Sequence, residues 1–117
     1  MMVKRFKHAL QGAGTAFSKD RHLLVHLLIA LLVAAAGFLL GLTSMEWLFV
    51  ISAIFVVLIS EVFNTSLEYA VDLVTGEYNE LAKHAKDTAA LAVLLASLYA
   101  AVTGLIIFIP KLIGLFA

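Results

Sequence analysis

Four polar side chains recur at helical spacing within an otherwise apolar part of the chain. Positions 60–74 read SEVFNTSLEYAVDLV, and the four residues are Glu61, Asn64, Glu68 and Asp72. At about 100° per residue, spacings of three, four and four residues place them on one helical stripe about 80° wide. Three carboxylates in one line repel one another unless a cation separates them. Ligands that are all oxygen favour Mg²⁺, with phosphate oxygens completing its coordination shell.

Two further polar groups flank this stripe in the sequence. The group that follows it contains Glu77, Tyr78, Asn79, Lys86 and Asp87. Lys86 and Asp87 stand just before the last apolar run, where a lysine reaching for the membrane interface and a helix-capping aspartate are the simpler interpretation. The group ahead of the first apolar run contains Lys19, Asp20, Arg21 and His22, which are either topology charges or, for Asp20, part of the same cation site.

Several common catalytic signatures are absent from the sequence. It has no GxxxxGK[ST] phosphate loop, no protein-kinase catalytic loop and no HExxH zinc pair. It also has no cysteine, which excludes disulfides, a thiol nucleophile and cysteine metal ligands. His26 stands alone in an apolar run, so we interpret it as a packed or hydrogen-bonding histidine rather than a metal ligand.

The composition is that of a membrane protein with one domain, residues 1–117. Hydrophobic residues make up 63% of the chain and charged residues 14%, with a mean hydropathy of +1.06; a soluble domain is nearer half apolar and a quarter charged. The net charge of zero suggests no nucleic-acid partner. We therefore predict an all-α integral membrane protein.

Three apolar runs are long enough to cross a hydrocarbon core, which takes about 20 residues. They predict transmembrane helices at about 23–42, 47–69 and 87–109. Since Pro110, the only proline, falls beyond the third span, no proline kink is expected.

The positions of the basic residues orient these helices. Seven lie before the first span or between the second and third, against only Lys111 at the other end. By the positive-inside rule, the N-terminus and the second loop are cytoplasmic and the C-terminus is outside. Residues 3–19 place Phe6, Leu10 and Phe17 on one helical face, which predicts an amphipathic helix on the membrane surface.

The expected depth of Glu61 makes the acidic stripe unusual. If the second span begins near Trp47, Glu61 lies about 9 Å inside the cytoplasmic boundary, at 1.5 Å per residue. A carboxylate at such depth costs up to about 3 kcal/mol, which favours a functional role over helix association through hydrogen bonds. A small cation carrier or channel remains an alternative, although residues 47–59 offer Ser52 as their only polar group after Trp47. A purely structural membrane subunit would leave the carboxylates without a purpose.

The segment EVFNTSLEYAVDLVTGEYNELAKHAKDTAALAVLLAS resembles the signature of the prokaryotic diacylglycerol kinase family. The likeness extends upstream to FKHALQG and downstream to TGLIIFIPKL, so that it covers nearly the whole chain. The threonine after Asn64, the LAKHAKD stretch and the IIFIPKL end are most similar to the Gram-positive branch, whose members are chiefly undecaprenol kinases.

The resemblance implies an ATP- and Mg²⁺-dependent kinase of a membrane lipid alcohol. It implies undecaprenol as the substrate, with diacylglycerol as the alternative, and a homotrimer of three-span subunits that share active sites. By motif position, Glu61 matches the proposed catalytic base, and Asn64 and Asp72 match polar residues of the same site. Glu68 matches a Mg²⁺ ligand. Positions that match nucleotide contacts are His8, Glu77, Tyr78, Asn79, Lys86 and Asp87.

Near the first span the sequence departs from the family pattern. Asp20 stands where the family usually has its other metal-ligating glutamate, and its side chain is one methylene shorter. His22 replaces the usual asparagine, and Leu24 replaces a polar or basic residue. We therefore expect Asp20 and Glu68 to hold the metal, with contacts that differ in detail from those of the family.

Overall fold

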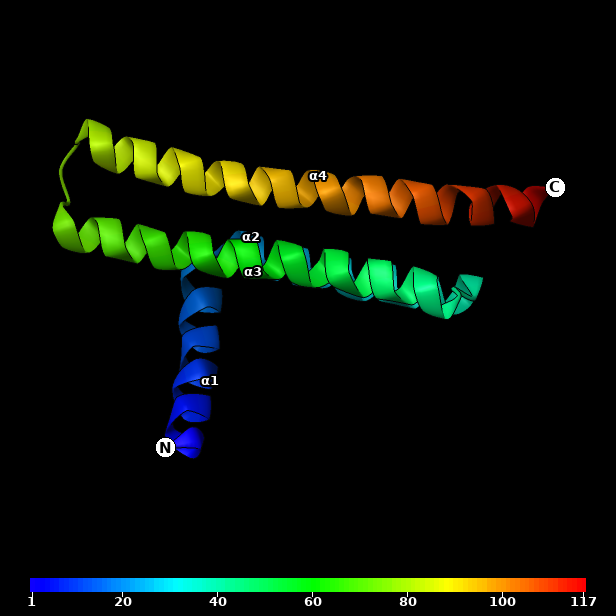
Figure 1. Cartoon of the computed structure of the whole chain (residues 1–117), viewed down its shortest axis with the longest axis horizontal. Helices are drawn as coiled ribbons and strands as arrows, with labels where there is room; N and C mark the ends of the chain where they lie inside the picture. The colour runs from blue at the N-terminus through cyan, green and yellow to red at the C-terminus, as the bar shows by residue number, and fades with distance from the viewer.

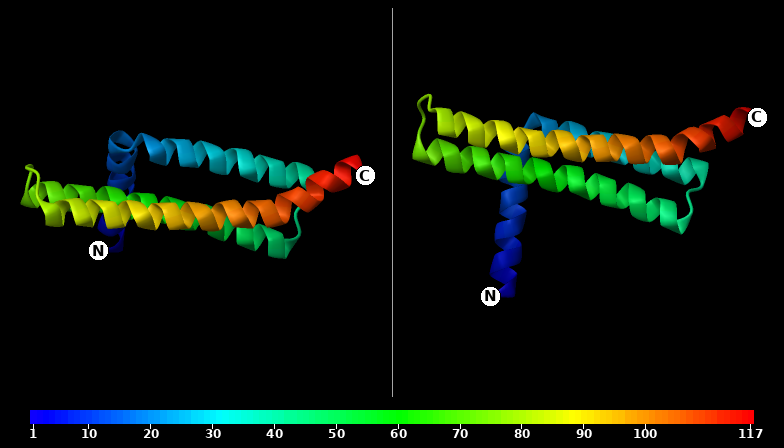
Figure 2. Two further views of the ribbon diagram at one scale, coloured as in Figure 1. Left: turned by 90° about the horizontal axis from the view of Figure 1, so that it is seen from above. Right: turned by 45° about the horizontal axis from the view of Figure 1, so that its top comes forward.

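The computed structural model describes the whole chain as four helices. They are α1 (Met2–Lys19), α2 (Arg21–Leu40), α3 (Ser44–Val74) and α4 (Glu80–Phe116). Helices α2, α3 and α4 run roughly alongside one another, whereas α1 leaves them at a steep angle (Figures 1 and 2). All three aligned helices are long and apolar enough to cross a membrane, which confirms the predicted all-α fold with three helices of membrane-spanning length.

Local sequence signals set the tight turn between α2 and α3. Gly41 ends α2 in the left-handed region with φ of 71°, a conformation that glycine adopts without steric cost. Thr43 then caps α3 in a capping box with Glu46. The Trp47 ring packs so closely on Gly37 that an added Cβ atom would lie 2.7 Å from it. These contacts fix how α2 and α3 pair at this end.

Helices α3 and α4 form a long antiparallel hairpin (Figure 1). The Ser52 and Tyr99 hydroxyl groups lie 3.0 Å apart across it. At the end far from the α3–α4 loop, Lys111 Nζ lies 3.0 Å from Glu46 Oε1. These polar contacts fix the register of the hairpin, and with it which residues of α4 face the acidic stripe.

Helices α3 and α4 are longer than the predicted spans, whereas α2 has the 20 residues predicted for the first span. At 1.5 Å per residue the 31 residues of α3 extend about 46 Å, beyond the roughly 30 Å of a hydrocarbon core. Hydropathy marks only the part of a helix that suits lipid, whereas backbone hydrogen bonds carry α3 and α4 on through polar residues. The Asp72 end of α3 and the start of α4 thus project as a paired helical extension.

The expectation about Pro110 is wrong. Helix α4 continues through Pro110 to Phe116 instead of ending before it. Figure 2 shows α4 changing direction in its last part. The physical reason is that proline lacks the backbone N–H for the bond to Ile106 and its ring crowds that turn, so the helix bends without ending.

The three aligned helices bury little of their surface against one another. Only 11 of 117 residues are buried, and large apolar side chains such as Leu32 and Phe63 are each 71% exposed. In water such a surface would be unstable. It suits a chain whose outer faces contact lipid or further copies of itself.

Candidate active site

Glu61 is the most buried carboxylate of the stripe, at 4% exposure. It lies on α3 and faces α2, where His26 Nε2 is 3.1 Å from Glu61 Oε1. Asp20, at the junction of α1 and α2, lies near enough to this carboxyl group to act on it electrostatically. The structure therefore brings Asp20 to the acidic stripe and surrounds Glu61 with groups from two other segments. His26 is a polar partner, in agreement with its interpretation as a hydrogen-bonding histidine.

Asn64 and Glu68 form the next turn of the stripe. Asn64 Nδ2 donates a hydrogen bond of 3.1 Å to Glu68 Oε1. The Asn64 Oδ1 atom is buried and has no partner. Because buried polar atoms are nearly always paired, this oxygen and the second oxygen of Glu68 are available to a ligand.

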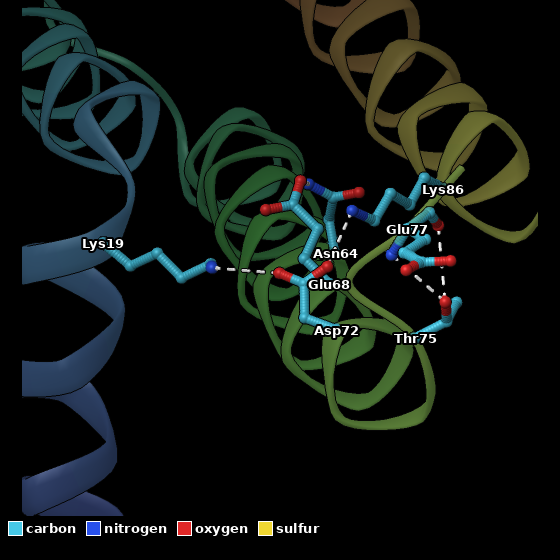
Figure 3. Close-up of polar contacts among 7 residues, drawn as sticks. All are labelled: Lys19, Asn64, Glu68, Asp72, Thr75, Glu77 and Lys86. Atoms are coloured by element: carbon cyan, nitrogen blue, oxygen red, sulfur yellow. Dashed lines mark hydrogen bonds and ion pairs between the residues drawn. The ribbon is translucent and has the colours of Figure 1, made fainter. Parts of the chain in front are cut away.

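Asp72 joins three helices at the outer end of the stripe (Figure 3). Lys86 Nζ of α4 donates a 2.8 Å hydrogen bond to Asp72 Oδ1, and Lys19 Nζ of α1 lies 3.9 Å from Asp72 Oδ2. Lys19 also lies 4.1 Å from the centre of the Tyr69 ring, an attractive cation–π distance. The two lysines place positive charge beside the carboxylates, as a polyphosphate site requires.

Asp20 has a structural role as well. Its Oδ1 atom accepts a 2.9 Å hydrogen bond from the His22 backbone N–H and so caps α2. The cap fixes the bend between α1 and α2. It also holds the carboxylate close to Glu61 despite the shorter side chain.

The remaining predicted nucleotide contacts are spread around the end of the molecule that carries the α3–α4 loop and α1. Asn79 caps α4 through Leu81 and Ala82, and Tyr78 is 80% exposed. Glu77 lies in a turn in which its backbone N–H donates to Thr75 Oγ1 (Figure 3). Their side chains do not join the stripe within this chain.

His8 and Asp87 also have partners of their own. His8 Nδ1 lies 3.2 Å from Gln11 Oε1 on exposed α1. Asp87 pairs with Lys83 at 2.7 Å in the second turn of α4. The interpretation of Asp87 as a helix cap is wrong, because α4 begins at Glu80 and is capped by Asn79.

The donor atoms near Glu68 are consistent with Mg²⁺. They are carboxylate and amide oxygens, and one of them, Asn64 Oδ1, is buried and unpaired. No three acidic or histidine side chains gather closely enough within one chain to hold a metal by themselves. Mg²⁺ normally uses only one or two carboxylates and completes its shell with water and phosphate, so the residues present fit that ion.

An apolar cavity of about 540 Å³ lies between α2, α3 and α4. Its lining is chiefly aliphatic. His26 lines the end of the cavity nearer the acidic stripe, together with Val57, which lies one helical turn before Glu61 on α3. A second groove of about 700 Å³ between α3 and α4 includes Asn64. Apolar space thus reaches the acidic stripe from the membrane side.

Comparison with known proteins identifies the type of site. Residues 7–108 match the family described as prokaryotic diacylglycerol kinase. The chain belongs to the prokaryotic diacylglycerol kinase family. It is accordingly a lipid kinase, as the sequence resemblance implied, and the alternatives of a cation carrier or a structural subunit are set aside.

Curated relatives align over most of the chain. The undecaprenol kinase of Bacillus subtilis (strain 168) is 38% identical over 109 residues, which cover 93% of this chain and 89% of that protein. The diacylglycerol kinase of Synechocystis sp. is 39% identical over 115 residues, 97% of this chain but 66% of that protein. The diacylglycerol kinase of Escherichia coli (strain K12) is 34% identical over 102 residues, covering 87% and 84%.

Two contacts of this lipid kinase were not foreseen from its sequence. Lys19 had been counted only as a topology charge, yet it faces Asp72 and Tyr69. The partnership of His26 with Glu61 was also missed. The available signal was a lone polar residue about one turn into the first span, which in a membrane requires a partner on another helix.

Proposed function

We propose that this kinase transfers the γ-phosphate of ATP to undecaprenol at the cytoplasmic face of a bacterial membrane. The observation that carries the proposal is a buried carboxylate, Glu61, at the top of apolar space and beside the oxygen-rich, lysine-flanked end of α3. The relative from Bacillus subtilis supports undecaprenol as the substrate. Diacylglycerol is the second candidate, supported by the names of the other relatives.

The chemistry follows from the positions of the side chains. The lipid hydroxyl approaches Glu61 from the cavity between the spans, and Glu61 takes its proton. The oxygen attacks the γ-phosphorus; the bond from that phosphorus to the β-phosphate oxygen breaks, and ADP leaves. Lys86 stabilises charge on the polyphosphate. Asn64 holds Glu68 in place by donating a hydrogen bond to it, and Asp72 holds Lys86 in place by accepting one from it.

Asp20 and Glu68 are the residues that would hold Mg²⁺. When bound, the ion neutralises charge on the phosphates and so lowers the barrier to transfer. The other nucleotide contacts would come from His8, Glu77, Tyr78, Asn79 and Asp87. Their dispersion within one chain is a reason to expect the site to be completed by a second subunit.

A homotrimer and a membrane-surface position for α1 belong to the same proposal. The family resemblance implies both. Support comes from the extensive exposed apolar faces of the spans and from the steep angle of α1 to them (Figure 1). A helix roughly perpendicular to the spans lies along the membrane plane if the spans cross it.

The direct test is lipid phosphorylation by the purified protein in detergent or lipid. We expect Mg²⁺-dependent transfer of labelled phosphate from ATP, with kcat/KM for undecaprenol at least about tenfold above that for diacylglycerol, a difference of about 1.4 kcal/mol. A preference for diacylglycerol would reassign the substrate. No labelled lipid with either substrate would contradict the proposed function.

The orientation of the chain in the membrane can be tested by single cysteine substitutions at two glycines. Gly76 lies in the α3–α4 loop and Gly114 near the end of α4, and a Cβ at either would meet nothing within 4 Å. In the cysteine-free chain, Gly76→Cys should react with a membrane-impermeant thiol reagent only from the cytoplasmic side, and Gly114→Cys only from outside. Reaction of both from the same side would contradict the orientation.

A further inference from the structure

The contact between His26 and Glu61 links two spans at the point where the chemistry is proposed to occur. His26 comes from α2 and Glu61 from α3, and their Nε2 and Oε1 atoms lie 3.1 Å apart. Glu61 is 4% exposed, so water contributes little to its orientation. Two lone pairs at this distance would repel, so a proton lies between the two atoms.

We propose that His26 is a positioning residue that fixes the Glu61 carboxylate for proton abstraction. This inference rests on the proposed role of Glu61 as the base. Occupation of Oε1 by the imidazole leaves Oε2 for the lipid hydroxyl. A base must lie within about 3 Å of the proton it takes, and small displacements of a reacting group are costly in rate.

The location of His26 adds a second argument. The same imidazole lines the apolar cavity between the three spans. A group that both borders this cavity and contacts Glu61 holds the base at the mouth of the space through which the lipid hydroxyl is proposed to arrive. Asp20 lies at the bend between α1 and α2, where its Oδ1 atom accepts from the His22 backbone N–H, and it does not line this cavity.

The test compares kcat and KM for His26→Leu and His26→Gln. Leucine fills similar space without a polar atom, and we expect kcat to fall about 10- to 100-fold while KM for ATP stays within about twofold. Glutamine places an amide N–H near the position of Nε2, and should restore kcat to within about fivefold of the original protein. His84→Leu is the matched control, because His84 is exposed on α4 and should tolerate the change.

A double variant separates positioning from a structural role. If His26 acts through Glu61, His26→Leu should cause little further loss of kcat in a Glu61→Gln background. Thermal melting is measured on every variant, since leucine leaves a buried carboxylate without its partner. An equal loss of kcat in both backgrounds, or a loss in His26→Leu that glutamine does not restore, would overturn the inference. So would an unchanged kcat for His26→Leu in an active enzyme, whereas inactivity of the original protein would instead overturn the proposed function.

Discussion

Glu61→Gln should reduce turnover by about 10²- to 10⁴-fold, the usual effect of removing one general base. Nucleotide affinity should stay near normal, because Glu61 is not one of the two proposed metal ligands, Asp20 and Glu68. The glutamine amide oxygen can keep the contact with His26, so the helix pairing is retained. Neutral glutamine is also less costly than glutamate at membrane depth, and the melting temperature should be unchanged or higher.

The measurement is kcat, ATP affinity and thermal melting on the same preparation. Glu46→Gln is the matched control, since it makes the same chemical change at the opposite end of α3, where the amide oxygen can still accept from Lys111 and from the Thr43 backbone N–H. Glutamine also serves in a capping box, so activity should survive there. An active Glu61→Gln variant, or one that loses stability instead of rate, would mean that the stripe is structural.

Glu68→Gln should instead weaken both Mg²⁺–ATP binding and turnover. The hydrogen bond from Asn64 Nδ2 survives, because a glutamine oxygen accepts it as a carboxylate oxygen does. What is lost is a negative charge beside the cation, which lowers metal affinity directly. We expect the apparent KM for Mg²⁺–ATP to rise about 10- to 100-fold, the range typical of a disturbed metal site.

A Mg²⁺ titration distinguishes Glu68 from Glu61. Added Mg²⁺ should partly restore the rate of Glu68→Gln and leave that of Glu61→Gln unchanged. Glu80→Gln serves as the control on the same side of the membrane, since Glu80 is exposed in the first turn of α4. If both stripe variants respond to Mg²⁺ in the same way, the division of roles between base and metal ligand is wrong.

Hydropathy and helical spacing were sufficient to predict most of the architecture. Apolar runs of about 20 residues can satisfy their backbone groups in lipid only as helices, which is why the three spans were predictable. The stripe of Glu61, Asn64, Glu68 and Asp72 was predictable because residues at these spacings share one helical face in any α-helix. The helix ends were less predictable, since hydropathy does not record where α3 and α4 leave the lipid.

What the sequence could not determine is which groups meet across the helices. Whether Lys19 and Lys86 reach Asp72, and whether His26 contacts Glu61, depends on the rotation and register of each helix about its neighbours. Those quantities result from the Gly37–Trp47 packing, the Asp20 cap and the Lys111–Glu46 contact acting together. By itself the sequence determined the membrane fold, the acidic stripe and the kinase family. Only the tertiary structure decided the partners of each carboxylate, because contacts between helices are set by packing geometry and not by spacing along one helix.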